Sequence, residues 1–358
     1  FDVGGISIFP IKLFQNHDYV LAFFNSNLSK YIIECLNPTV NKQVGDIERV
    51  PFVIPQKKQE EIVTKLAGIN INIKSKLDSY RIYDFNFQLS PLNFLSNGDF
   101  KTNLSSFFNY ENYLNAIVYL NEALINKVIH VIYDLTEEDI NKVITKEGID
   151  IGSIPVSNEA LNAFIEEKTP IESCLSDEIV EYINSLSRKN LLADQKEIIE
   201  HHLNSLYQNN YEMEDLCVRH EINPIELWYL FKQSHVIPSQ KMNVLSIEFL
   251  SDMIRDILME DDDGIIPLVP NAGEKILLDR IEERFIEKGF SMAQYSSFDN
   301  LVGRELNEFI NKYFFSKFCN SLNLFRHMPL TPFIWHISSG PEQGFDCYLI
   351  IYKWNRDR

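Results

Sequence analysis

Cysteine is scarce in this sequence, and long apolar runs are missing. The 358 residues include five cysteines, an odd and scattered set: Cys35, Cys174, Cys217, Cys319 and Cys347. Such usage predicts reduced, buried thiols in a cytoplasmic protein rather than a disulfide framework. No stretch approaches the roughly 18 consecutive apolar residues that a membrane span needs, and the first residues do not have the pattern of a signal peptide. The sequence therefore predicts no membrane partner.

The motifs of independent enzymes are also missing. No Gly-rich phosphate loop lies between a strand and a helix, and no Gly-x-Ser-x-Gly elbow occurs. The acidic run "MEDDDG" (259–264) lacks the alternate ligand spacing of a calcium loop and is interpreted as a solvated turn. Cys217 and His220 have the spacing of half a zinc site without a second pair nearby, and His336 is interpreted as a packing histidine. We expect no catalytic, cofactor-binding or metal-ligating residues.

Lys and Arg are fewer than Asp and Glu overall, but the imbalance differs along the chain. The formal net charge is −18. Residues 1–110 contain 11 Lys and Arg against 10 Asp and Glu, whereas residues 111–358 contain 22 against 41. Because a phosphate backbone is contacted by local basic surface, only the first third is predicted to face DNA. The acidic remainder is interpreted as scaffold or as a platform for other proteins.

The first hundred residues predict a small mixed piece followed by a spacer helix. The opening "VGGISIF" is typical of a turn and a short strand. Residues 17–36 repeat apolar side chains at helical spacing behind an expected N-cap at Asp18. "RVPFVIP" (49–55), with a Pro near each edge, favours a short or edge strand. From Gln56 to Tyr80 apolar residues advance by threes and fours, which predicts a long helix, although residues 69–73 alone also fit an alternating strand.

The rest of the chain predicts a large helical body and a terminal β-hairpin. Residues 111–133 have the strongest helical pattern. Further helical patterns lie at 175–188, 194–208, 212–219, 224–234, 245–259, 273–289 and 299–325. Two β-rich runs, 331–340 and 345–354, are joined by "PEQG" as in a hairpin. The fold class expected is α+β, predominantly helical.

Residues 211–238 contain two short predicted helices around "EINP" and resemble a helix-turn-helix. A second helix that reads DNA carries basic and amide side chains on its outer face. The outer face expected here carries Glu226, Trp228, Tyr229, Lys232 and Gln233. Because this face is mixed and lies in an acidic region, an ordinary helical hairpin is favoured over a DNA contact.

The segment 19–66, "YVLAFFNSNLSKYIIECLNPTVNKQVGDIERVPFVIPQKKQEEIVTKL", is similar to the end of target-recognition domains in DNA methyltransferases and type I restriction specificity subunits. In those domains a helix leads to a polar turn, a strand ending in Pro and a long spacer helix. The matching positions are Phe24, Asn25, Ser26, Val50, Pro51, Ile54, Pro55, Gln59, Ile62 and Val63. The form "LNPTVNKQVGDIERVP" narrows the resemblance to adenine-specific methyltransferases of the BREX phage-defence type, the PglX family.

Other segments carry the same resemblance. "FDVGGISIF" looks like the family's link after its recognition region, "LNEALINKVIHVIYDLTEEDI" resembles its Asn-Glu-x-x-Leu-Asn helix, and "DDDGIIPLVP" resembles its Asp-x-Ile-Ile-Pro turn. The last segment, from Tyr313, looks like its C-terminal signature. The matching positions there are Tyr313, Phe314, Pro332, Trp335, Ser339, Gly340, Gly344, Phe345 and Tyr352. Residues 150–245 match weakly.

The catalytic motifs of the family that this sequence resembles do not occur in it. Its Asn-Pro-Pro-Tyr loop for the extruded adenine and its Gly-containing loop for S-adenosylmethionine do not occur, and "NPT" (37–39) lacks the second Pro and the aromatic residue. The chain also begins with Phe1 rather than Met. We therefore expect a fragment from downstream of the catalytic domain, without transferase activity alone, with S-adenosylmethionine bound by the missing upstream domain.

The resemblance implies a domain order. Residues 1–55 would end a recognition-like domain, 56–105 would form the spacer helix and connector, 106–325 the helical C-terminal domain, and 326–358 the terminal hairpin. The function implied is a non-catalytic DNA-recognition and scaffold region of an N6-adenine methyltransferase, which must hold a duplex in register while a base is flipped out. The expected partners are double-stranded DNA, through the parent enzyme, and other defence-system proteins.

Within the near-neutral first third, six residues are candidates for DNA contact, against the alternative that each is a solvated surface residue. They are Lys12, Asn16, Lys42, Gln43, Lys57 and Lys58. A second hypothesis is an acidic helical module that docks other components of the defence complex. A third is an acidic surface that mimics DNA and blocks a cationic channel of a neighbouring protein.

Overall fold

Helices make up 67% of the structure, a computed structural model, and a small antiparallel sheet lies near the C-terminus, which confirms the α+β, predominantly helical class. The residues described are 8, 16–82, 84, 86–95, 99–168, 175–206, 212–271, 273–319, 334–340 and 344–353, with side chains except those of 317–319. The strand expected in the opening residues lies outside this set. No helix in the described part of the chain is long and apolar enough to cross a membrane.

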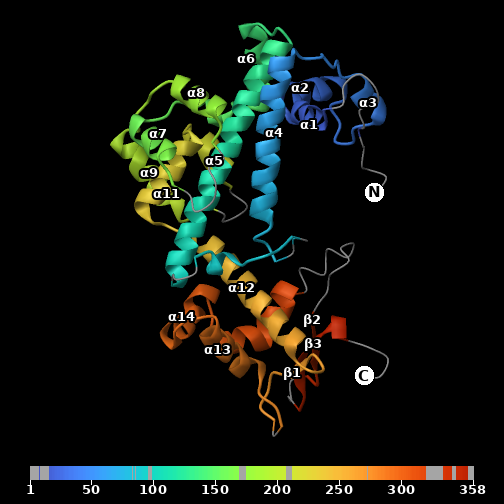
Figure 1. The fold of residues 1–358 in the computed structure, drawn as a ribbon, viewed down its shortest axis with the longest axis vertical. Coiled ribbons are helices and arrows are strands. Elements are labelled where there is room, and N and C mark those ends of the chain that lie inside the picture. The colour runs from blue at the N-terminus through green and yellow to red at the C-terminus, as the bar shows by residue number, and fades with distance from the viewer. Residues whose placement is uncertain are drawn as a thin grey trace. The chain divides into compact units, whose positions relative to one another are not determined.

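The chain folds into two compact units, each built from two segments of sequence. Unit 1 comprises residues 1–76 and 109–236, and unit 2 comprises residues 77–108 and 237–358. The long helices α4 (Lys57–Asp78) and α5 (Phe100–Ile132) supply residues to both units (Figure 1). The domain bounds expected from the sequence stay predictions.

Ser26 divides the first predicted helix into α1 (His17–Asn25) and α2 (Asn27–Leu36). The Ser26 hydroxyl accepts a hydrogen bond from the backbone N–H of Ser29, so it caps α2 rather than continuing α1. The expected N-cap at Asp18 is wrong. Asn16 caps α1 instead, because its side-chain oxygen accepts from the backbone N–H of Tyr19 at 3.2 Å.

The strand expected over 49–55 is wrong. This segment follows the short helix α3 (Val44–Glu48) and has no strand partner among the described residues. Its backbone is held by one side chain, since the Tyr133 hydroxyl donates to the carbonyl of Pro51 and lies 3.2 Å from the N–H of Val53. Phe52 packs edge-on against Phe23. Aromatic contacts of Phe52 and the Tyr133 hydroxyl therefore hold this segment without a strand, while the side chains of Phe52, Val53 and Ile54 stay exposed.

The spacer helix is confirmed as α4, and the alternation over 69–73 lies within that helix. The helix predicted at 111–133 is α5, which begins eleven residues earlier, at Phe100. The added turns bury Phe100, Leu104 and Phe107, so tertiary packing extends the helix beyond its strongest sequence pattern.

Unit 1 continues with further helices, of which the first two were not predicted. They are α6 (Glu137–Glu147), α7 (Asn158–Ile165), α8 (Asp177–Ser185), α9 (Ala193–Leu203), α10 (Met213–His220) and α11 (Pro224–Ser234). The two short helices around "EINP" are confirmed as α10 and α11. The expected outer face is wrong at Trp228, which is fully buried beside Tyr113 and Phe164, and at Glu226, which accepts hydrogen bonds from Ser157. Two of the five residues expected on the outer face therefore pack inward.

Unit 2 is organised around α12 (Ser239–Glu260) and a cluster of phenylalanines. Its other helical elements are η1 (Pro91–Asn93), α13 (Leu277–Glu287), α14 (Met292–Val302), α15 (Leu306–Glu308), the π-helix η4 (Phe309–Cys319) and η5 (Ile351–Lys353). The cluster consists of Phe100, Phe249, Phe285, Phe290 and Phe298. Edge-on and tilted ring pairs of this kind add stability beyond the area that they bury.

The terminal hairpin is confirmed as β2 (Ile334–Ser338) and β3 (Asp346–Ile350), which pair antiparallel with Trp335 opposite Leu349. A third strand that the sequence did not predict, β1 (Ile265–Pro267), pairs with the other edge of β3. The sheet order is β1-β3-β2, so β3 is central and every one of its residues is buried.

Candidate functional site

The turn after α2 is held by the side chain of Asn37. We call residues 37–43 the Asn37 loop. Asn37 accepts from the backbone N–H of Thr39 at 2.9 Å and donates to Asp46 at 2.6 Å, while the Lys42 ammonium donates to the Asn37 carbonyl at 2.5 Å. The hydrogen bond from Asn37 is the largest influence that lowers the pKa of Asp46. These bonds fix the loop, and Val40 at its tip is 97% exposed.

The six residues expected to contact DNA differ in their surroundings. Lys12 lies outside the described residues. Asn16 caps α1 and also donates to Thr64 at 2.7 Å and to Glu60 at 3.2 Å, so its amide joins α1 to α4. Lys42 lies within the Asn37 loop and is half-buried there, with its ammonium on the Asn37 carbonyl.

The other candidates are more open to solvent. The side chain of Gln43 is exposed just before α3. Lys57 and Lys58 are exposed in the first turn of α4, and Lys57 pairs with Glu61 at 3.8 Å across a fully hydrated surface. The structure thus places Lys42 and Gln43 in the Asn37 loop, and Lys57 and Lys58 at the start of α4.

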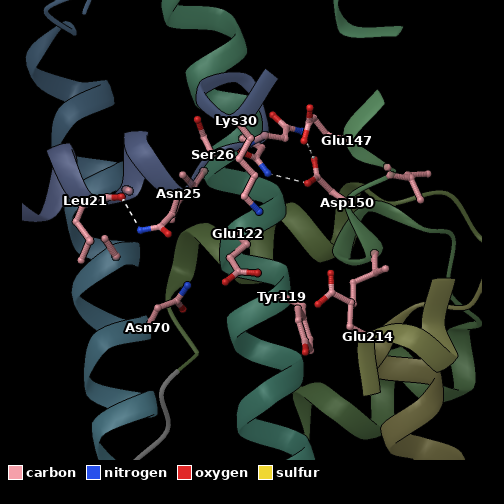
Figure 2. A pocket seen from close by; sticks show the side chains of 18 of the residues that line it. Leu21, Asn25, Ser26, Lys30, Asn70, Tyr119, Glu122, Glu147, Asp150 and Glu214 are labelled. Carbon is pink, nitrogen blue, oxygen red and sulfur yellow. Dashed lines mark hydrogen bonds between the residues drawn. The ribbon is translucent and has the colours of Figure 1, made fainter. Parts of the chain in front are cut away.

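A polar pocket of about 490 Å³ lies within unit 1 and was not predicted. We call it the acidic pocket. Figure 2 shows its walls, which come from α1, α2, α4, α5, the turn after α6 and the start of α10. Its charged side chains are Lys30, Lys74, Glu122, Glu147, Asp150, Glu212 and Glu214. Five carboxylates therefore share the pocket with two ammonium groups.

Asp150 is held at the wall of the pocket by amides. Asn126 donates to one of its carboxylate oxygens at 2.7 Å, and Asn27 approaches the other at 3.4 Å. Burial raises the pKa of Asp150 to about 6, against the hydrogen bond from Asn126. The following turn, η2 (Ile151–Ser153), lies against α5 because Gly152 has no side chain, since a Cβ there would clash with the backbone of Tyr119.

Glu122 projects from α5 into the same pocket. The surrounding walls remove much of its hydration and raise its pKa to about 7, although the side chain stays open to solvent. Lys74 and Lys30 oppose this shift, and Glu214 and Asp150 add to it. A carboxyl group with this pKa changes its charge near neutral pH.

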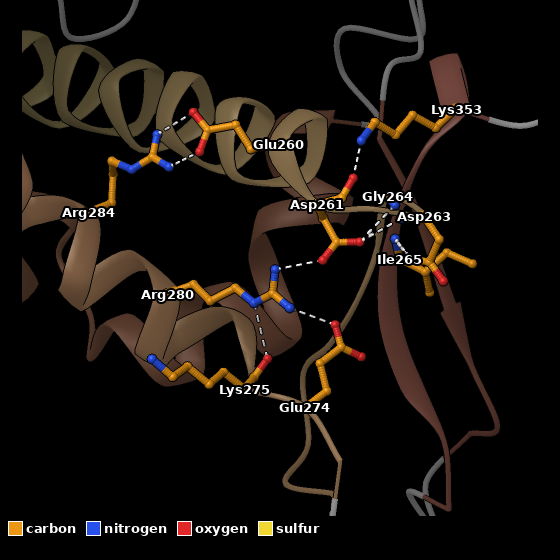
Figure 3. A network of polar contacts seen from close by, with 10 residues as sticks. All are labelled: Glu260, Asp261, Asp263, Gly264, Ile265, Glu274, Lys275, Arg280, Arg284 and Lys353. Carbon is orange, nitrogen blue, oxygen red and sulfur yellow. Dashed lines mark hydrogen bonds and ion pairs between the residues drawn. The ribbon is translucent and has the colours of Figure 1, made fainter.

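The acidic turn in unit 2 is more than the solvated turn that was expected. Asp262 and Asp263 are exposed, but the side chain of Asp261 is 10% exposed and pairs with Arg280 at 2.7 Å. Asp261 also accepts from the backbone N–H of Gly264 at 2.9 Å, and its carbonyl accepts from Lys353 (Figure 3). Gly264 has a positive φ of 73°, which favours glycine.

Arg284 and Glu260 add a second ion pair to the group in Figure 3. Together these pairs tie the end of α12 to α13 and the sheet. Among the residues that the structure describes, no group of three or more His, Cys, Asp or Glu side chains is arranged to hold a metal ion. The acidic turn is therefore a structural junction.

The histidines and cysteines are also largely structural. His336 on β2 lies 2.5 Å from Asp346 on β3 and packs against Tyr348, in agreement with a packing role. Cys217 is fully buried, and the ring of His220 lies 3.3 Å from that of His202. The expectation of buried cysteines is wrong for Cys35, which is exposed on α2.

Neither a protein-family model nor a curated protein matches this chain.

Proposed function

We propose that this chain is a non-catalytic C-terminal DNA-recognition and scaffold region of an S-adenosylmethionine-dependent N6-adenine DNA methyltransferase from a phage-defence system. The observation that carries the proposal is the Asn37 loop. The segment that resembles the methyltransferase family, "LNPTVNKQVGDIERVP", folds into a cross-braced turn whose tip is open to solvent. A loop that is already ordered loses less conformational entropy when it contacts a duplex.

The charge distribution within unit 1 supports the same assignment. Residues 1–76 contain nine Lys and Arg against seven Asp and Glu, whereas residues 109–236 contain nine against 23. Phosphate contacts require local positive potential, so the N-terminal segment is the part of this unit that suits DNA. Lys57 and Lys58 would contact phosphates, because they are exposed and lie at the N-terminus of a helix.

Fluorescence anisotropy with a labelled duplex, measured over a range of salt concentrations, tests this function. The wild-type chain is expected to bind at low salt with an affinity that falls steeply as salt rises. Charge reversal at Lys42, Lys57 and Lys58 is expected to reduce the salt slope by about three, since each phosphate contact contributes about 0.9.

The matched control reverses Lys168, Lys189 and Lys196 in the acidic segment, which changes the net charge of the chain by the same amount. This control is expected to keep most of the binding. Equal losses in both triple variants, or no binding of the wild type at low salt, would contradict DNA recognition. The chain alone is also expected to leave adenines unmethylated when S-adenosylmethionine is supplied.

The acidic helices of unit 1 favour a second candidate function, a module that docks other proteins of the defence complex. The excess of 14 acidic residues over 109–236 suits a basic protein surface. This function predicts no DNA binding at low salt, together with co-purification of other proteins encoded by the same defence system.

A further inference from the structure

Among the described residues, one polar side-chain contact joins α9 to another element of unit 1. The Nδ1 atom of His202, in the last turn of α9, lies 3.3 Å from the Nε2 atom of His220 at the end of α10. The other polar contacts of α9 side chains are local: Gln195 caps the start of the helix, and Lys196 lies 4.0 Å from Glu200 one turn later. The position of α9 therefore depends on this histidine pair and on apolar packing.

The two histidine rings contact each other through nitrogen atoms. Their centres are 5.4 Å apart and their planes are inclined by 37°, so the rings meet at their edges rather than stack. A hydrogen bond between two imidazoles needs one nitrogen that carries a proton and one that has a free lone pair. A neutral ring offers both kinds of nitrogen, whereas a protonated ring offers only donors. The contact can therefore form while no more than one ring is protonated.

The groups around the pair influence the second proton in both directions. They are His201 on α9, Arg219 and Glu221 at the end of α10, Lys189 before α9, and Glu226 on α11. The carboxylates and the two helix C-termini favour an imidazolium, but Glu226 already accepts hydrogen bonds from Ser157. Burial, the charge of His202 and the charge of Arg219 together lower the pKa of His220. The surroundings thus oppose a second positive charge beside His202.

We propose that the His202–His220 pair is a pH-sensitive switch that holds the end of α9 in place and lets this helix open when both rings are protonated. Two protonated rings would direct N–H groups at each other, so the hydrogen bond would be replaced by repulsion between like charges. Opening would expose Ile199 and Leu203, which are buried in the closed helix. The proposal does not depend on DNA recognition, because none of the six DNA-contact candidates lies in α9 or α10.

The sign of the pH dependence follows from His220. Its pKa in the folded chain lies below the usual value of 6.5, so the closed form binds fewer protons than the open form. The free energy that keeps α9 closed is therefore fully present above pH 6.5 and falls as the pH drops below that value. At pH 7.5 the hydrogen bond is kept, whereas at pH 5.5 the second proton competes with it.

Amide hydrogen exchange of the full chain, read by mass spectrometry at pH 7.5 and pH 5.5 and corrected for the intrinsic exchange rates, tests the switch. The protection of residues 193–203 is expected to fall about fivefold or more at the lower pH, as for the loss of one hydrogen bond. The helix α7 in the same unit is the internal reference, and its protection is expected to stay unchanged. A local opening is thereby distinguished from a general loss of stability.

His202→Gln and the matched control His201→Gln separate the pair from its neighbours. A Gln amide can still donate to His220 but is not protonated over this pH range, so His202→Gln is expected to lose the pH response of α9. His201→Gln removes an exposed ring from the same turn and is expected to keep that response. Equal pH responses in the two variants would overturn the proposal, as would a wild-type α9 that loses no more protection than α7.

The wild-type chain also gives a readout that does not depend on how a variant folds. Exchange of the C2–H of each histidine ring reports its protonation, and His220 is expected to take up its proton over the same pH range in which α9 loses protection. His220→Gln is expected to abolish the response from the other side of the pair. Protonation of both His202 and His220 with α9 still protected would overturn the switch.

Discussion

Clustered carboxylates have opposite pKa shifts in the two units. In unit 2, burial alone would raise the pKa of Asp261, but the hydrogen bonds from Arg280 and from the backbone N–H of Gly264 lower it below its usual value. In unit 1, the pocket walls around Glu122 raise its pKa to about 7 although its side chain is exposed, and the nearby lysines do not compensate. Acidic clusters therefore line a pocket in each unit, of about 420 Å³ in unit 2 and about 490 Å³ in unit 1, but in unit 2 Arg280 and Arg284 pair with the carboxylates.

The difference lies in the geometry of the cationic partner. The Arg280 guanidinium is planar and donates to Asp261 at 2.7 Å and to Glu274 at 2.6 Å, so one cation neutralises two carboxylates. The Lys30 side chain ends in a single ammonium that makes no such pair with Glu122. The guanidinium therefore offsets the cost of placing Asp261 in a partly buried site, whereas Glu122 has no such partner in Figure 2.

The largest effect is expected from removing the cation of the paired cluster. Arg280→Met leaves Asp261 with its side chain mostly buried and without its ionic partner. We expect the free energy of unfolding to fall by about 2–3 kcal/mol, because an uncompensated charge is left in a partly buried site. Urea denaturation followed by circular dichroism measures this loss.

A matched control for Arg280→Met is Lys275→Met, which breaks an ion pair with Glu283 between two exposed side chains. Exposed pairs contribute about 0–1 kcal/mol, so this control is expected to change stability little. Similar losses in both variants would show that the two pairs are equivalent and would remove the distinction between the clusters.

A smaller effect is expected from Glu122→Gln, with a pH dependence opposite to that of a paired carboxylate. The folded pKa of about 7 lies above the usual glutamate value of 4.5, so ionised Glu122 destabilises the native state above pH 7, and this penalty disappears as pH falls toward 4.5. The variant is expected to be more stable at pH 8, by about 1 kcal/mol or less because the side chain is solvated.

Thermal unfolding of Glu122→Gln and wild type at pH 8 and at pH 5 checks this sign. The advantage of the variant should be present at the higher pH and largely absent at the lower one. A variant that is less stable than the wild type at pH 8 would mean that Glu122 has a stabilising partner, and the two clusters would then follow the same rule.

Local patterns predicted the elements whose apolar residues repeat regularly. The bounds of α11 coincide with the expected 224–234, and the hairpin strands β2 and β3 fall within the two β-rich runs. The helix α6 was missed because its sequence is largely charged, although the capping box of Thr136 and Asp139 marks its start. A cap signal was therefore available where the apolar pattern was weak.

The remaining features depend on contacts between distant residues. The strand β1 has only three residues and forms because Ile266 pairs with Tyr348 of β3. The acidic pocket has the same origin: Lys30, Glu122 and Asp150 are far apart in sequence and meet only in the folded unit. No motif of the kind used to search for catalytic or metal sites links such residues, so the sequence could not reveal the pocket.

The smallest effect on stability is expected at the proposed DNA contacts. A surface residue there should change the free energy of unfolding less than a residue of either acidic cluster. Lys57→Gln removes a pair with Glu61 between two highly exposed side chains and is expected to change the free energy of unfolding by less than about 0.5 kcal/mol. The same variant is expected to reduce the salt slope of DNA binding by about one, as for one lost phosphate contact. Urea denaturation and salt-dependent anisotropy on the same sample measure the two quantities. An unchanged salt slope would remove Lys57 from the DNA-contacting surface, and a large loss of stability would place it among residues that hold the fold together.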